Sequence, residues 1–223
     1  MKTKSFIVIF FKGNTIIQIL INYVLFFVSI FTYSQSLNME IGQSTAAYSH
    51  KNQVPKVNFF PTSGQVFRVA YAQTFWGDHE LNIGASIEQA NSLGSVIDTE
   101  IVYDTQFLGI FGKFDMNIIN IFNRKHCSSC TDIQFFATLG GQLSTLIGGS
   151  QKINEVTYSL KGVEDFKGIW VAPLVGIKVK FDAADFISLY GLYEFMPMIN
   201  VTDNQEKFRI NQRIMAFGIR LWL

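Results

Sequence analysis

Apolar and polar residues alternate along most of the chain after residue 35, and the alternation is clearest in residues 211–223. There Met215 and Phe217 lie on an apolar face, and Arg220 lies on the opposite face. A period of two is typical of a β-strand that faces two different environments. As the last stretch of the sequence, this strand leaves an apolar edge that needs a partner, and closing the sheet into a barrel supplies one.

The same alternation predicts eight strands, at 37–48, 65–76, 80–88, 101–122, 133–146, 169–181, 187–195 and 211–223. Long polar connections are expected at 49–64, 91–100, 147–168 and 197–206, with shorter turns between them. Long outer loops that alternate with short periplasmic turns are typical of transmembrane barrels. The expected fold is therefore all-β: an eight-stranded antiparallel up-and-down transmembrane β-barrel after an N-terminal signal peptide.

Two places disturb the pattern. Phe107 and Phe111 fall on the inward face of the strand 101–122, which fits if they fill space beside glycines or if a bulge shifts the register. Pro173 cannot donate a hydrogen bond to a neighbouring strand, so it is expected near the rim.

The first 34 residues have the pattern of a secretory signal peptide. Lys2 and Lys4 precede an apolar run at 16–31, and small residues precede a cleavage position before Gln35. A retained membrane anchor is the alternative, because the run approaches the length of a spanning helix. Residues 35–223 then form one barrel domain in the cell outer membrane, since no later segment is continuously apolar for ~18 residues.

Composition narrows the class further. The formal charge is +1, charged residues make up 16% and aromatic residues 15%, and the mean hydropathy is +0.22. These values give no basic footprint, so nucleic acid is not an expected partner. A soluble barrel of the lipocalin type would reverse the two faces, but its exterior would be richer in Lys and Glu.

Charged residues gather on the face assigned to the lumen. Charges inside a barrel need pairing or hydration, and an eight-stranded lumen is just wide enough for side chains to fill. We therefore expect a polar lumen plugged by ion pairs, with a proton or ion pathway as the alternative. The expected network comprises Glu40, Arg68, Glu88, Lys113, Asp115, Lys178, Lys180, Glu194 and Arg220.

No residue pattern predicts catalysis, a cofactor or a metal. The histidines His50, His79 and His126 all fall in predicted loops or turns. An enzyme acting on lipid at the outer rim, with His50 and a loop Ser, is the only catalytic alternative. Acidic pairs in the outer loops, such as Asp98 with Glu100, are expected to be solvated or to bridge lipopolysaccharide through divalent cations.

The signal peptide ending at Tyr33–Ser36, the eight alternating strands and the segment 217–223 resemble the small outer-membrane barrels common in Bacteroidetes, the PorT-like and OmpA/OmpX-like group. In that segment, Gly218, Leu221, Trp222 and Leu223 are similar to a barrel-assembly signal, although the aromatic residue is at 222 and not at the end.

The resemblance implies a non-enzymatic barrel that contacts membrane lipid or lipopolysaccharide, and the assembly machinery during insertion. Its outer loops would serve binding, adhesion or envelope integrity through an extracellular ligand. A secretion-system accessory barrel is the alternative.

Cys127 and Cys130 lie in the predicted turn at 123–132. A disulfide fits an oxidising compartment, while reduced thiols or a metal site remain alternatives. We expect intact-mass measurement to show no alkylation before reduction and two alkyl groups after it. Two alkyl groups without reduction would contradict the disulfide.

Overall fold

The computed structural model describes residues 35–50, 58–75, 78–96, 99–121, 132–163, 166–202 and 208–223. The chain divides into two units, 1–33 and 34–223, and the described residues belong to the second. They form the strands β1 (Gln35–His50), β2 (Asn58–Thr74), β3 (Glu80–Gln89), β4 (Ser92–Val96), β5 (Thr99–Ile121), β6 (Ile133–Ile153), β7 (Val156–Ser159), β8 (Trp170–Ala184), β9 (Ile187–Asn200) and β10 (Phe208–Trp222). Within these ranges, no helix is long and apolar enough to cross a membrane.

Eight of the described strands close into a ring. Antiparallel pairing runs β1–β2–β3–β5–β6–β8–β9–β10 and back to β1. Following paired residues around the ring from Gln35 leads back to Thr45, ten residues further along β1. With strands ~4.8 Å apart and ~3.3 Å per residue, this stagger corresponds to a strand tilt of roughly 40°. The expected eight-stranded barrel is confirmed.

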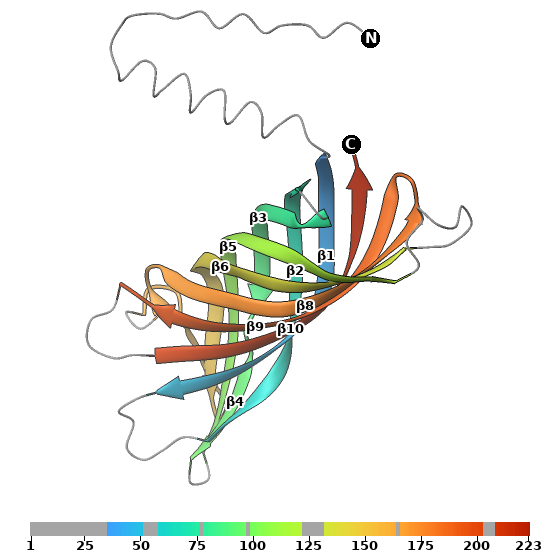
Figure 1. Ribbon diagram of the computed structural model, residues 1–223. Helices are drawn as coiled ribbons and strands as arrows, with labels where there is room; N and C mark the ends of the chain where they lie inside the picture. The colour runs from blue at the N-terminus through green and yellow to red at the C-terminus, as the bar shows by residue number, and fades with distance from the viewer. Residues whose placement is uncertain are drawn as a thin grey trace, which may run out of the picture. The chain divides into compact units, whose positions relative to one another are not determined.

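The two ends of the barrel differ. At what we call the near end, the Leu223 N–H donates a 3.0 Å hydrogen bond to the Gln35 carbonyl, and a two-residue turn joins β8 to β9. At the far end, β4 pairs with both β2 and β5, while β7 pairs with β6. Figure 1 shows β1 and β10 side by side, and β4 at the opposite end from the C-terminus.

The predicted long loops are partly wrong, because the strands continue into them. β2 begins at Asn58, β4 and the start of β5 form a hairpin within 91–100, β6 extends to Ile153, and β9 extends to Asn200. The residues of these extensions do not alternate regularly: β2 continues from Asn58 with Phe59, Phe60 and Pro61, and β9 continues through Pro197 and Met198. Pairing continues there without the alternation that marks a strand in the sequence.

Phe107 and Phe111 point inward, with 0% and 3% of their surface exposed. Both physical reasons offered for this placement are present. Phe111 lies opposite Gly84, and a register irregularity separates Gln106 from Phe107.

Pro173 is the fourth residue of β8. The described β8–β9 ladder pairs Val171 and then Val175, with no pair between them, so the missing proline N–H falls in this gap.

Gly84 and Gly112 provide a matched test of the close packing inside the ring. A Cβ on Gly84 would lie 2.2 Å from the Val69 carbonyl oxygen, whereas a Cβ on Gly112 meets nothing within 4 Å. We expect Gly84→Ala to destabilise the barrel by about 1–3 kcal/mol, the usual cost of overpacking, and Gly112→Ala to have little effect. Urea unfolding in lipid vesicles measures both, and equal midpoints would contradict the packing described.

Candidate functional site

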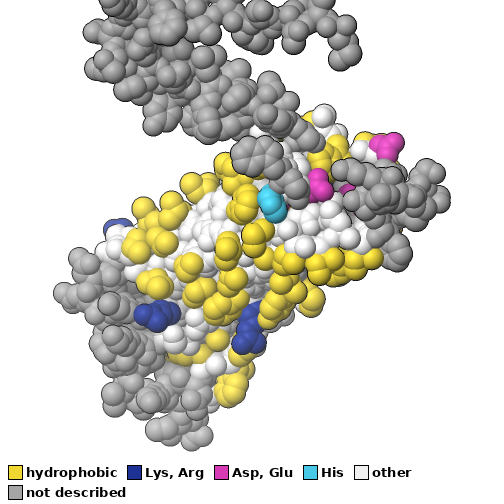
Figure 2. All heavy atoms as spheres, viewed as in Figure 1, with side chains coloured by type: hydrophobic (Ala, Val, Ile, Leu, Met, Phe, Trp, Pro, Cys, Tyr) yellow, Lys and Arg dark blue, Asp and Glu magenta, His cyan; other side chains and the backbone are white. Residues whose placement is uncertain are grey.

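The outer wall carries a continuous apolar band. On β5 the outward side chains are Leu108, Ile110, Phe114 and Met116, each at least 39% exposed. This stretch of nine residues, interrupted on its outward face only by Gly112, matches the 9–11 residues that a tilted strand needs to cross a bilayer. Figure 2 shows hydrophobic side chains spread over the visible face, with few charged atoms between them.

The first of two charged layers inside the ring lies towards the near end. It is organised around Glu80, which is fully buried. Arg220 binds both Glu80 carboxylate oxygens, one of them through Nη2 at 2.6 Å. Lys178 and Lys180 approach the same carboxylate at 2.5 and 2.9 Å. Lys178 also pairs with Asp115. Three cations therefore face two carboxylates, which leaves one positive charge in excess.

A second layer lies at mid-height around Arg68 and Lys113. The Arg68 Nε donates a 2.8 Å hydrogen bond to Glu88, and its Nη1 pairs with Glu194. Lys113 Nζ lies 2.8 Å from Glu40 and 3.0 Å from Glu194. Here two cations face three carboxylates, so the excess negative charge balances the excess of the first layer.

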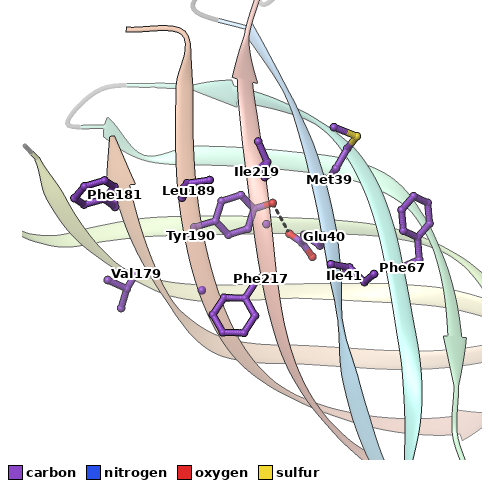
Figure 3. A pocket seen from close by; sticks show the side chains of 12 residues that line it. Met39, Glu40, Ile41, Phe67, Val179, Phe181, Leu189, Tyr190, Phe217 and Ile219 are labelled. Atoms are coloured by element: carbon purple, nitrogen blue, oxygen red, sulfur yellow. Dashed lines mark hydrogen bonds between the residues drawn. The ribbon is translucent and has the colours of Figure 1, made fainter. Parts of the chain in front are cut away.

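Tyr190 lies between the two layers, with Lys178 Nζ of the first layer 5.3 Å from its ring centroid and its hydroxyl directed at the second layer. It donates a 3.1 Å hydrogen bond to Glu40, drawn as a dashed line in Figure 3. The Tyr190 ring passes close to the inner side of Gly218, where an added Cβ would lie 2.2 Å from Tyr190 Cζ. Gly218 therefore provides the space that Tyr190 needs to reach Glu40.

All nine residues expected in the lumen network are buried, with at most 3% of their surface exposed. Glu80, the residue with the most cations around it, is missing from that set. Alternation along 80–88 places Glu80 on the same inward face as Glu88. The adjacent turn obscured this, because Glu80 is the first residue of β3.

Towards the far end the interior is less polar than expected. Beyond the second charged layer, the buried Gln212 lies within a layer of apolar side chains that include Met196, Met198, Ile210 and Ile214, all with 0% exposure. The sequence gives little sign of this layer. In β9, Phe195 and Pro197 face outward while Met196 and Met198 face inward, so both faces are apolar and the alternation disappears.

Aromatic residues close this apolar layer towards the far end. Phe166 lies in the connection before β8, and Trp170 is the first residue of β8. Both are buried, and their ring centroids are 6.2 Å apart. Tyr48 stacks on Tyr103 at 5.0 Å, and its hydroxyl lies 2.6 Å from both the Ala90 carbonyl and Thr105 Oγ1. Burial raises the pKa of Tyr48, so the phenol stays protonated as a hydrogen-bond donor.

Among the described residues, no group of three or more His, Cys, Asp or Glu residues could hold a metal ion. His79 Nδ1 accepts a 3.0 Å hydrogen bond from the Asn117 N–H, a contact within the near-end turn region. Outside the described residues lie the expected signal peptide at 1–34, His126, Cys127, Cys130 and the side chain of His50.

An apolar groove of about 700 Å³ lies on the outer wall across β8, β9, β10, β1 and β2. Its lining includes Met39, Phe67, Val179 and Phe217 (Figure 3). It is part of the lipid-facing band, where acyl chains would fill it.

The closed eight-stranded ring, with an apolar exterior and ion pairs inside, defines a transmembrane β-barrel of the outer-membrane class. This inside-out distribution is the reverse of a soluble barrel, because lipid cannot solvate charges or unpaired backbone groups.

No protein-family model and no curated protein sequence matches the chain. Among solved structures, the outer membrane protein OprG from Pseudomonas aeruginosa is 7% identical, with 86% of this chain and 96% of that chain covered and a TM-score of 0.48. Neisserial surface protein A is 13% identical, with coverages of 83% and 96% and a TM-score of 0.44. The attachment invasion locus protein Ail of Yersinia pestis is 11% identical, with coverages of 85% and 100% and a TM-score of 0.40. At these identities and TM-scores, the likenesses carry no inference about function.

Glu80→Gln tests the organisation of the near-end layer. The substitution leaves the buried charges of Arg220 and Lys180 without their carboxylate, so we expect about 3–5 kcal/mol of destabilisation. Glu100→Gln, at an exposed carboxylate of β5, should change stability by less than about 0.5 kcal/mol. Unfolding in urea from lipid vesicles compares the two, and a Glu80→Gln barrel as stable as the unsubstituted protein would exclude Glu80 as the organising residue.

Proposed function

We propose that the protein is a non-enzymatic, non-conducting barrel of the cell outer membrane whose far-end connections serve binding, adhesion or envelope integrity. The filled interior is the observation that carries this proposal. Two charged layers and an apolar aromatic layer occupy successive heights of the ring. A channel needs continuous water along the axis, and buried side chains packed at three successive heights of the ring oppose it.

The rigidity of the ring supports a role in which its far-end connections bind other molecules. The ring is rigid because each of its strands pairs on both sides, and loops held on a rigid scaffold are where binding residues are most often found. At the far end, β7 extends the β6 edge and exposes Val156 and Tyr158 at 54% and 52%. An extracellular ligand would meet this end first if the near end faces the periplasm.

The orientation follows from the barrel-assembly signal proposed at Gly218, Leu221, Trp222 and Leu223. Leu221, Trp222 and Leu223 lie at the near end, where β10 meets the start of β1, and Gly218 lies further from that end on β10, opposite Glu40. Recognition of a terminal strand by assembly machinery in the periplasm would leave that end inside. The resemblance to PorT-like and OmpA/OmpX-like barrels is part of the same proposal.

Membrane fractionation and planar-bilayer recording test the proposal together. We expect the folded protein in the outer-membrane fraction, with heat-modifiable mobility on gels, and no stable conductance steps after reconstitution. An open porin recorded in the same bilayers is the positive control. Reproducible large steps would contradict the closed interior, and recovery of the mature protein dissolved in the periplasm would contradict the membrane location.

A further inference from the structure

Four glutamines form a row across the outer wall where the apolar band ends. Gln43 on β1 pairs with Gln65 on β2, and Gln89 on β3 pairs with Gln106 on β5. The Gln65 N–H donates a 3.1 Å hydrogen bond to Gln89 Oε1, which joins the two pairs. The row therefore crosses four adjacent strands without interruption.

Each glutamine is the first outward polar residue after an apolar one on its strand. Ile41, Phe67, Ile87 and Leu108 precede them on the near-end side, and these side chains are 40–69% exposed. Because the strands tilt by roughly 40°, the row climbs about 3 Å per strand through the interfacial zone of the membrane.

A groove of about 400 Å³ lies along this row. The lining on its near-end side, which we call lower, is apolar and includes Ile41, Phe67 and Ile87. The lining on its far-end side, which we call upper, consists of the four glutamines. No Lys, Arg, Asp or Glu lines it. A ligand that fits would have an apolar part below and an uncharged hydrogen-bonding part above.

The glutamine amides are available to such a ligand. Gln43 and Gln65 are exposed, and the described residues give the side-chain amides of Gln43, Gln65 and Gln106 no hydrogen-bond partner. Each amide has two donor hydrogens and one acceptor oxygen. Where acyl chains exclude water, amides left unpaired cost free energy, so a lipid that supplies both donors and acceptors would be preferred to one that does not.

We propose that this groove is a binding site for a glycolipid, with its acyl chains on the apolar lower lining and its sugar hydroxyls and acyl carbonyls on the glutamines. The proposal rests on the outer-membrane location proposed above. The groove is continuous with the lipid-facing band, which makes a membrane lipid its occupant. Its lack of cationic side chains favours hydroxyl and carbonyl groups over a phosphate, which arginine and lysine bind best.

Native mass spectrometry of the full-length folded protein tests this site. The protein is reconstituted with equal amounts of phosphatidylglycerol and a neutral glycosyl diacylglycerol that carry the same acyl chains, so only the head groups differ. We expect the glycolipid to be retained roughly tenfold more than the phospholipid, the ratio that one or two added hydrogen bonds provide. Gln43→Leu combined with Gln65→Leu should reduce this preference to near unity.

Thr145→Leu combined with Asn211→Leu is the matched control, since both residues are exposed, lie on β6 and β10, and do not line the groove. This variant should keep the glycolipid preference. Equal retention of the two lipids by the unsubstituted protein, a preference for phosphatidylglycerol, or a glycolipid preference that survives the double glutamine variant would each overturn the site. Insertion of all variants with heat-modifiable mobility would leave the membrane-barrel proposal intact, whereas failure of the unsubstituted protein to insert would overturn that proposal instead.

Discussion

Closure of the sheet by the pairing of β1 with β10 is the constraint on which the rest of the structure depends. In lipid, backbone N–H and C=O groups have no water to bind, so every strand of the ring must be paired on both sides. Eight strands staggered by ten residues fix the width of the lumen. That width brings Glu80 within reach of Arg220 from the opposite part of the chain, and it places Arg68 between Glu88 and Glu194.

Within the apolar band, the fold could be predicted from the sequence because lipid and lumen impose opposite demands on alternate residues. Strands β3, β5 and β10 illustrate this, since their inward and outward residues differ sharply. Outside the band this regular alternation is lost. The extension of β2 back to Asn58 escaped prediction because Phe59, Phe60 and Pro61 are consecutive apolar residues, and β4 is only five residues long.

The sequence predicted which charged residues point into the lumen better than it predicted the contacts that they make there. Alternation placed Lys113 and Lys178 on the inner face, but it could not indicate which carboxylates they meet. Those partners come from strands distant in sequence, such as Glu40 and Glu194 around Lys113. The aromatic closure by Phe166 escaped prediction for a related reason. Phe166 belongs to a connection that turns into the barrel, and residues in connections carry no periodic signal of burial.

The net charges of the two charged layers are opposite in sign and sum to zero. Five buried cations and five buried carboxylates mean that a voltage across the membrane exerts no net pull on the filled core. The near-end layer is positive by one charge and the mid-height layer is negative by one, so together they form a dipole along the barrel axis. Such a core responds to an electric field only through this small internal separation of charge.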